Sequence, residues 1–357
     1  MSELGKSSTA QLGSPRSDLP ESDAAKQRAG KTSGRDEIRS NLSRARLHGM
    51  LNALSVVGGL IVLVVVFSIA SPYFFTTTNI YHILQQVAVV AVLAVGQSFV
   101  IYTAGIDLSQ GALLGLCAVG GADVMVLAHS IVFGVLTALA IGAASGCVAG
   151  LLITRAKLVP FIATLAMLGI TEGSALLFTN AQPVFNIPAS FYAFGSNGIY
   201  VFPYIVLVTL GIALFFQIYS TETKGGRYIY AIGSNQRGAT TVGLRANRVI
   251  LGVYVLSGLL VGVAALLQVA YVNTGQPSSN TAILLESIAA VVIGGGSLFG
   301  GEGMIWGSMI GALLISVLYN GTELLGISTY IQTILLGVVV VMAVSINNFR
   351  QKERVAA

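Results

Sequence analysis

Apolar residues run through this chain in long blocks between about residue 52 and residue 346, and short polar stretches separate them. The blocks are about 18 to 22 residues long, the length that crosses a bilayer as a helix, whereas a transmembrane barrel would need alternating segments of about ten residues. The pattern therefore predicts an all-α polytopic membrane protein with about ten transmembrane helices. The expected spans are Asn52–Ser71, His82–Thr103, Leu108–Leu127, Ser130–Thr154, Val159–Thr179, Tyr200–Tyr219, Val249–Ala270, Ala282–Ser297, Met304–Leu325 and Thr329–Ile346.

Composition supports the membrane assignment. Of the 357 residues, 54% are hydrophobic and only 9% are charged, with a mean hydropathy of +0.81, so the chain has too little polar surface to enclose a soluble core. Cys117 and Cys147 lie in apolar blocks without a CxxC motif, which favours small core residues over a disulfide or a metal site. The net charge of +5 gathers in the tail and loops and does not indicate nucleic-acid binding.

The positions of Lys and Arg predict the topology, because these residues mark the loops that stay in the cytoplasm. Between Leu51 and Phe349 there are seven of them, and the loops of the opposite side have none. Ten spans that start inside also end inside, so both termini are expected in the cytoplasm of a bacterial plasma membrane. The seven are Arg155, Lys157, Lys224, Arg227, Arg237, Arg245 and Arg248.

Residues 1–50 are polar and without periodicity, which predicts a disordered cytoplasmic tail. A cleaved signal peptide ending near Ser68-Ile-Ala70 is the alternative, but the tail is too long for a signal-peptide n-region. We therefore expect a permease domain at 51–346 and a second cytoplasmic tail at 347–357.

Ten spans can be divided into two inverted five-helix halves, the arrangement of many transporters. This expectation comes from counting, since no residue-level repeat is visible. Small residues recur at helix-contact spacing, as in Gly258 and Gly262, and indicate a packed bundle.

The segment 220–248 contains five of the seven basic residues but no span. Ser234 or Asn235 can cap a helix, Gln236–Val242 supplies about two turns, and Gly243 can end it. The segment is either a solvated loop or a docking element for a cytoplasmic partner, and a helix that buries little of itself favours docking.

The chain shows no convincing nucleotide site. The nearest match to a phosphate-binding loop is Gly30-Lys31-Thr32, where Ala25 replaces the first glycine and neither a strand nor a helix is predicted alongside. We expect no catalytic residue, metal or cofactor in this chain. If transport uses ATP and Mg²⁺, another subunit hydrolyses the ATP.

Acidic residues in or beside the spans are functional candidates, because burying a charge in a membrane is costly. Asp107 with Ser109 can cap a helix or contact a ligand, whereas Glu172 and Glu286 suit a water-lined or subunit-interface position. An ion-coupled carrier would use such acids directly, and an uncharged polyol would need only amides, hydroxyls and aromatic faces. The other acids are Asp123, Glu302 and Glu323, and the amides are Gln85, Gln86, Gln97, Gln110, Gln268 and Asn273.

An ordered set of motifs resembles the membrane permease of ABC sugar importers of the ribose/xylose/arabinose/galactoside type. The resemblance covers about Asn52 to Val344. Its motifs are Gly105-Ile-Asp-Leu-Ser-Gln-Gly111, Val159-Pro-Phe-Ile-Ala-Thr-Leu-Ala-Met-Leu168, Thr179-Asn-Ala-Gln-Pro183, Gly226-Arg-Tyr-Ile-Tyr-Ala-Ile-Gly-Ser-Asn235, Glu286-Ser-Ile-Ala-Ala-Val-Val-Ile-Gly-Gly295, Ser297-Leu-Phe-Gly-Gly-Glu-Gly303, Asn320-Gly321 and Leu325-Gly-Ile327.

The resemblance implies a homodimer, or a pairing with a sister permease, bound to an ABC ATPase and supplied with sugar by an extracytoplasmic solute-binding protein. It also implies that segment 220–248 is the coupling loop. The candidate coupling residues are Gly226, Arg227, Ala231, Gly233, Asn235, Arg237 and Gly243. The candidates for the substrate path or an interface are Asp107, Gln110, Glu172, Asn180, Gln182, Glu286 and Asn320.

The chain departs from the family pattern at Gln110, where Val or Ile is common, and at Gly296, where Thr is common. The sugar is therefore not assigned: pentoses, hexoses and polyols all fit. The alternative functions are an ion-coupled secondary carrier and an ABC permease for amino acids or nucleosides.

Overall fold

The computed structural model divides the chain into two units, Met1–Leu51 and Asn52–Ala357, and describes residues 56–278 and 281–356. The described residues belong to the second unit. The predicted disordered tail at 1–50 and the triplet Gly30-Lys31-Thr32 lie outside the described residues, as does the start of the first predicted span.

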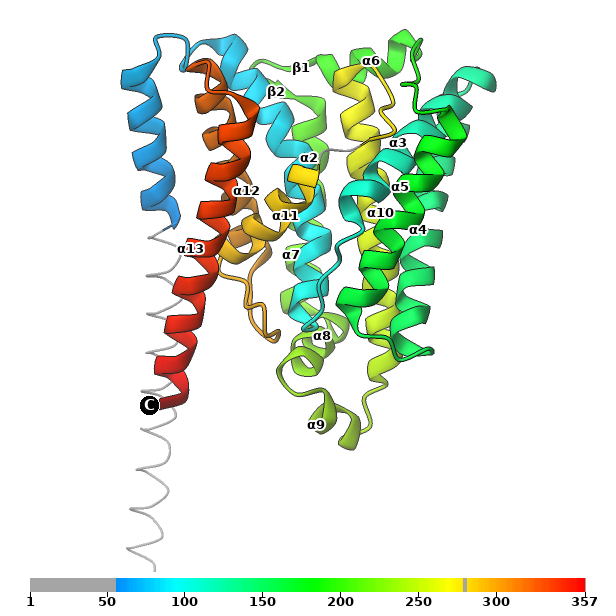
Figure 1. Cartoon of the computed structure of the whole chain (residues 1–357), viewed down its shortest axis with the longest axis vertical. Coiled ribbons are helices and arrows are strands. Elements are labelled where there is room, and N and C mark those ends of the chain that lie inside the picture. Colours follow the sequence, from blue (N-terminus) through cyan, green and yellow to red (C-terminus); the bar gives the residue numbers. More distant parts are fainter. Residues whose placement is uncertain (1–55, 279–280, 357) are drawn as a thin grey trace, which may run out of the picture. The chain divides into compact units, whose positions relative to one another are not determined.

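Long apolar helices make up most of the second unit (Figure 1). Among the described residues, seven are long and apolar enough to cross a membrane, and three further apolar helices are shorter. These ten agree with the predicted number. The seven are α2 (Thr77–Tyr102), α3 (Gln110–Leu127), α4 (Ile131–Thr154), α5 (Pro160–Thr179), α7 (Tyr204–Glu222), α10 (Ala246–Val272) and α12 (Ile305–Leu324); the shorter apolar stretches are Val56–Ala70, Ala282–Ile293 within α11 (Thr281–Ile293) and Thr329–Met342 within α13 (Thr329–Ala356).

The remaining elements are small and lie at the two ends of the bundle (Figure 1). At one end lie α6 (Ala189–Ser196) and a hairpin of β1 (Gly198–Ile199) and β2 (Phe202–Pro203), paired antiparallel with Gly198 opposite Pro203. At the other end lie α8 (Lys224–Ser234) and α9 (Gln236–Thr241). We call this second end the basic end, because it holds the segment with most of the basic residues.

The two halves of the unit follow the same order of elements in opposite directions (Figure 1). Each half has a long central helix, α2 or α10. In each half non-helical residues follow this helix, 103–109 after α2 and the described residues 273–278 after α10, and a shorter helix, α3 or α11, comes next. The order supports the inverted repeat that the number of spans predicted.

The returning segment of the first half is buried by protein. The Gln110 amide lies beside Gly96 of α2, more than one turn before that helix ends, so α3 begins well inside the bundle. Thr103, Gly105 and Asp107 are all buried. Non-helical backbone at membrane depth is tolerated only where protein or water satisfies its polar groups, and protein does so here.

Small residues allow the central helices to approach closely. A Cβ atom on Gly142 or Gly146 of α4 would overlap backbone carbonyls of α10, at Gly258 and Tyr254 respectively. In the second half, a Cβ atom on Gly311 of α12 would overlap the backbone carbonyl of Ala290 of α11. The predicted small-residue contacts are thus helix-packing contacts, which compensate for the weak hydrophobic drive inside a bilayer.

Several boundaries differ from the sequence expectation. The eighth predicted span is α11, which has only 13 residues and is too short to cross a bilayer. The last helix, α13, continues through the predicted tail as far as Ala356. The short helix expected at Gln236–Val242 is present as α9, and the segment contains a second helix, α8, that was not predicted.

Candidate functional site

Two local caps fix the corner that α8 and α9 form. Thr223 accepts a hydrogen bond from the N–H of Gly226 through its side-chain oxygen (3.1 Å) and so caps α8. Asn235 accepts one from the N–H of Gly238 (2.8 Å) and caps α9. Gly243 follows α9 with φ +89°, a conformation that favours glycine. The cap at Asn235 and the position of Gly243 after the helix agree with the sequence prediction.

One face of α8 packs into the bundle. Gly226, Ile229 and Ile232 are buried, and they recur every three residues on one side of the helix. A Cβ on Gly226 would overlap the carbonyl oxygens of Tyr219 and Ser220, so glycine allows the tight turn between α7 and α8. The helix α8, which was not predicted from the sequence, is therefore stabilised by a narrow apolar stripe that packs against the bundle.

The end of α8 meets the end of α2 and the loop before α12 in a contact that we call the glycine joint: Tyr102, Tyr230, Gly233, Gly301 and Gly303. The N–H of Gly301 donates to the Tyr102 carbonyl (3.0 Å), and the Tyr230 hydroxyl donates to the Gly303 carbonyl (3.2 Å). The rings of Tyr102 and Tyr230 stack with centroids 5.1 Å apart. A Cβ on Gly233 would overlap the Tyr102 carbonyl, and one on Gly303 would overlap the Tyr102 ring.

Burial raises the pKa of the Tyr230 phenol above its ordinary value. The hydroxyl therefore keeps its proton throughout the physiological range and can donate to Gly303. The joint connects α8 to both halves of the bundle through hydrogen bonds and ring stacking.

The opposite face of α8 and most of α9 point away from the bundle. Arg227, Ala231 and Arg237 are exposed, and Val242, just after α9, is 79% exposed. The Arg227 guanidinium donates to the Glu222 carbonyl at 3.2 Å. The exposed residues of the two helices include small, basic and apolar groups. They have the chemical variety that a docking surface for another protein needs.

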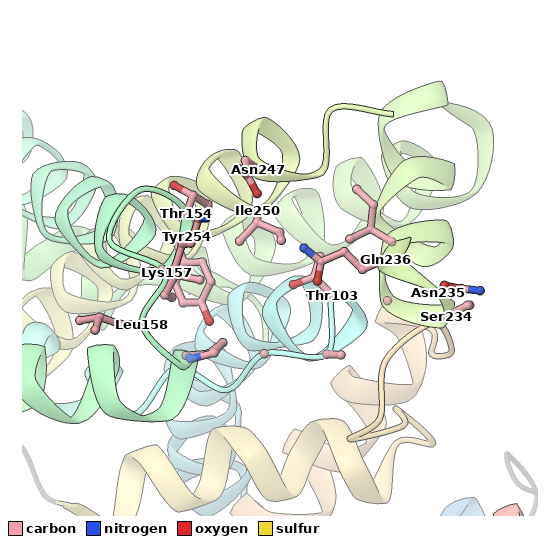
Figure 2. Close-up of a pocket in the computed structure, with 16 residues that line it drawn as sticks. Thr103, Thr154, Lys157, Leu158, Ser234, Asn235, Gln236, Asn247, Ile250 and Tyr254 are labelled. Carbon is pink, nitrogen blue, oxygen red and sulfur yellow. The ribbon is translucent and has the colours of Figure 1, made fainter. Parts of the chain in front are cut away.

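A pocket of about 500 Å³ lies between this corner and the transmembrane helices (Figure 2). Its walls come from the segment after α2, the end of α4 with the loop that follows, the α8–α9 junction and the start of α10. It is lined by Thr103, Ala104, Gly105, Ile153, Thr154, Lys157, Leu158, Pro160, Ile232, Gly233, Ser234, Asn235, Gln236, Asn247, Ile250 and Tyr254.

Asp107 and Gln110 belong to a buried polar network between three parts of the bundle. One oxygen of Asp107 accepts from the N–H (3.0 Å) and the hydroxyl (2.6 Å) of Ser109, directly before α3 begins. The other accepts from Ser257 of α10 (3.1 Å). Gln110 donates to Ser257 (2.9 Å) and accepts from Ser287 of α11 (3.2 Å).

All five side chains of this network are at most 2% exposed. Ser109 directly precedes α3 but forms no side-chain cap bond, so the cap expected from Asp107 and Ser109 is replaced by this network, which ties the returning segment to α10 and α11. The assignment of Asp107 and Gln110 to the substrate path stays a prediction. Ser257 and Ser287 were not predicted from the sequence, because a single serine within an apolar helix forms no recognisable motif.

Asn320 of α12 forms a reciprocal amide pair with Asn79 of α2. Each amide nitrogen donates to the oxygen of the other, at 2.9 and 2.8 Å, and Asn79 also donates to the Phe74 carbonyl. Both side chains are buried. Such a pair holds two helices together in a medium that offers no other partner.

The two carboxylates favoured by sequence reasoning lie in different surroundings. Glu172 is exposed on the outer face of α5, and the space beside Gly169 and Gly173 on the same helix is open. Glu286 is half-buried on α11, close enough to Tyr271 and Tyr319 for electrostatic interaction. The structure therefore does not bring the two acids together in one site.

Asn180 and Gln182 lie just beyond α5 at the end opposite the basic end. Asn180 ends the helix in a left-handed conformation with φ 50°, and both residues are exposed. No group of three or more metal-ligating side chains occurs in residues 56–278 and 281–356. The candidate substrate residues are thus spread over the bundle and do not form one cluster.

Comparison with known proteins adds a family to this geometry. Residues 79–344 match the family described as branched-chain amino acid transport system / permease component. The chain is 40% identical over 297 residues to the ribose import permease protein RbsC of Escherichia coli (strain K12), covering 82% of this chain and 92% of that protein.

Two further relatives carry other sugars in their names. The D-allose transport system permease protein AlsC of Escherichia coli (strain K12) is 33% identical over 82% of this chain and 90% of its own length. The fructose import permease protein FrcC of Rhizobium meliloti is 35% identical over 78% of this chain and 80% of its own length. No solved structure matches the chain.

Proposed function

Because the chain belongs to the family described as branched-chain amino acid transport system / permease component, we propose that it is the membrane subunit of an ATP-driven importer for a sugar or polyol. The family description names amino acids, whereas relatives with similarity over most of their length are named for ribose, allose and fructose. Similarity to sugar permeases over 80 to 92% of their length is the observation that carries the proposal and favours a sugar over an amino acid or nucleoside.

The α8–α9 corner is the coupling element in this proposal. Its outer face carries Arg227, Ala231, Arg237 and Val242, which are free to contact a cytoplasmic ATPase, and its inner face ends in the glycine joint. A partner that moves this corner moves the end of α2 with it. The ATP and Mg²⁺ are bound by that partner. A solute-binding protein delivers the sugar at the opposite, extracytoplasmic end.

The orientation follows from charge. Arg155 and Lys157 lie with the α8–α9 segment at the basic end, and this concentration of basic residues supports a cytoplasmic position for this end in a bacterial inner membrane. Both termini are then cytoplasmic.

We further propose that two copies of the chain pair through the outer face of α5. Glu172 is exposed on this membrane-spanning helix, and a carboxylate facing hydrocarbon is costly unless protein or water covers it. Gly169 and Gly173, four residues apart, leave room for a second helix to approach closely. Glu172 then lines the polar path between the copies.

The importer assignment predicts uptake that needs ATP. In proteoliposomes containing the chain, its cognate ATPase and its solute-binding protein, labelled D-ribose, D-allose or D-fructose should accumulate only with ATP and Mg²⁺. An ion-coupled carrier, the alternative function, predicts uptake without the ATPase that collapses with the proton or sodium gradient. Such uptake would contradict the proposal.

The dimer predicts a specific cross-link. In a variant lacking Cys117 and Cys147, Gly169→Cys or Gly173→Cys should form a disulfide between two copies under mild oxidation, giving a dimer band on a non-reducing gel. Gly211→Cys on α7 is the matched control, because the space beside that glycine is also open. Equal cross-linking at all three positions, or none at α5, would reject this interface.

A further inference from the structure

The pocket of Figure 2 presents hydrogen-bond acceptors at three places. Thr103, Thr154 and Ser234 each donate their hydroxyl proton to a backbone carbonyl of their own helix. The acceptors are Val100 (2.8 Å), Gly150 (2.7 Å) and Tyr230 (2.9 Å). Because the protons are committed, these hydroxyl oxygens offer lone pairs to a ligand that can donate.

The same pocket also contains donors. The amides of Gln236 and Asn247 and the ammonium group of Lys157 make no side-chain hydrogen bond within the described part of the chain. Tyr254 also lines the pocket, and its buried hydroxyl has no hydrogen-bond partner among the described residues.

The combination of acceptors and donors in the pocket favours one class of ligand. The hydroxyl group of a polyol both donates and accepts, so a polyol can satisfy both sets of groups. A phosphate or carboxylate only accepts and leaves the three lone-pair sites unused. One ammonium and no carboxylate line the pocket, and its volume of about 500 Å³ lies in the usual range of small-molecule sites.

We propose that this pocket binds the imported sugar from the cytoplasmic side, and that its occupancy slows further import. This product site rests on the proposed function, from which it takes the sugar and the cytoplasmic position of the basic end. A sugar in the pocket bridges the end of α4, the α8–α9 junction and the start of α10. Coupling requires the α8–α9 corner to move relative to these helices, so a ligand that joins them holds the corner still.

The test uses proteoliposomes of the complete importer with ATP and Mg²⁺ inside and initial uptake of labelled sugar as the readout. The vesicles are preloaded with the unlabelled transported sugar, with its phosphate ester, or with potassium glutamate of equal osmolarity. The variant Thr154→Val removes a pocket hydroxyl without changing side-chain size. Thr137→Val is its control, because Thr137 lies on the same helix and donates to the carbonyl four residues before it but is outside the pocket.

We expect preloaded sugar to reduce wild-type uptake severalfold and the phosphate ester to have little effect. Thr154→Val combined with Asn247→Ala should need about tenfold more internal sugar for half inhibition, while uptake into empty vesicles stays at the wild-type rate. Thr137→Val should respond as the wild type does.

Three results would overturn the product site while leaving the importer intact. They are uptake that internal sugar does not slow, equal inhibition of the double variant and the wild type, and inhibition by the phosphate ester as strong as by the sugar. Absence of ATP-driven uptake into empty vesicles would instead refute the proposed function, and the product site with it.

Discussion

Replacing Gly233 by alanine should reduce ATP-driven uptake to the level measured without ATP, while the protein still inserts and purifies normally. A Cβ at this position would overlap the carbonyl oxygen of Tyr102 and crowd the backbone nitrogen of Gly301. Both neighbours are backbone atoms, so no side chain can turn away to make room. The end of α8 must then separate from α2, and movement of the α8–α9 corner no longer reaches the bundle. The measurement is uptake in proteoliposomes beside ATP hydrolysis by the same preparation.

The matched control is Gly252→Ala on α10, where nothing lies within 4 Å of an added Cβ. This change should leave uptake unchanged and can stabilise the helix by up to about 1 kcal/mol. Loss of uptake with continued ATP hydrolysis in Gly233→Ala would identify a coupling defect. Normal uptake by this variant would show that the glycine joint does not transmit the movement.

Replacing Asp107 by alanine should produce the largest loss of stability among the polar substitutions considered. The carboxylate accepts three hydrogen bonds, two from Ser109 and one from Ser257, at a site that is 2% exposed. Removing it leaves these donors unpaired, at a cost of about 2 to 4 kcal/mol in the free energy of unfolding. The expected result is a melting temperature in detergent lower by about 5 to 10 °C.

Two further variants test whether the hydrogen bonds are the cause. Asp107→Asn keeps an acceptor oxygen of the same shape and should recover most of the stability. Asp123→Ala on α3 removes a half-exposed carboxylate that makes no side-chain hydrogen bond in the described residues, so its effect should stay within about 0.5 kcal/mol. Equal destabilisation by Asp107→Ala and Asp123→Ala would contradict the role of the network.

The length and spacing of the apolar blocks predicted the number of apolar helices, because lipid forces backbone polar groups to bond within a helix. A helix need not cross the whole bilayer where protein, and not lipid, surrounds its backbone. The eighth predicted span is shorter than a bilayer because its start lies inside the bundle, and the apolar run Ala282–Ser297 contains no signal of that depth. No local pattern predicts α8, because Gly225 and Gly226 disfavour a helix and only tertiary packing stabilises it.

Some of the functional residues could be predicted from local sequence, and others could not. Asn235 and Gly243 were predicted from local capping chemistry, and the structure shows both at the ends of α9. Tyr102 and Tyr230 were not predicted, because each reads as an ordinary aromatic residue until the two rings stack across 128 positions of chain. Contacts between distant segments depend on the packing of whole helices, which no single stretch of sequence encodes.

The segment that returns into the bundle after α2 has a mechanical consequence. It joins the glycine joint at Tyr102 directly to the buried network at Asp107 and Gln110, and only a few non-helical residues lie between them. Hydrogen bonds hold both ends of this segment, because the N–H of Gly105 donates to the Val100 carbonyl (3.0 Å) and Asp107 accepts from the N–H of Ser109 (3.0 Å). Residues 103–109 therefore act as a short tether, and a pull on the end of α2 at the membrane surface becomes a pull on the first turn of α3, deep within the protein.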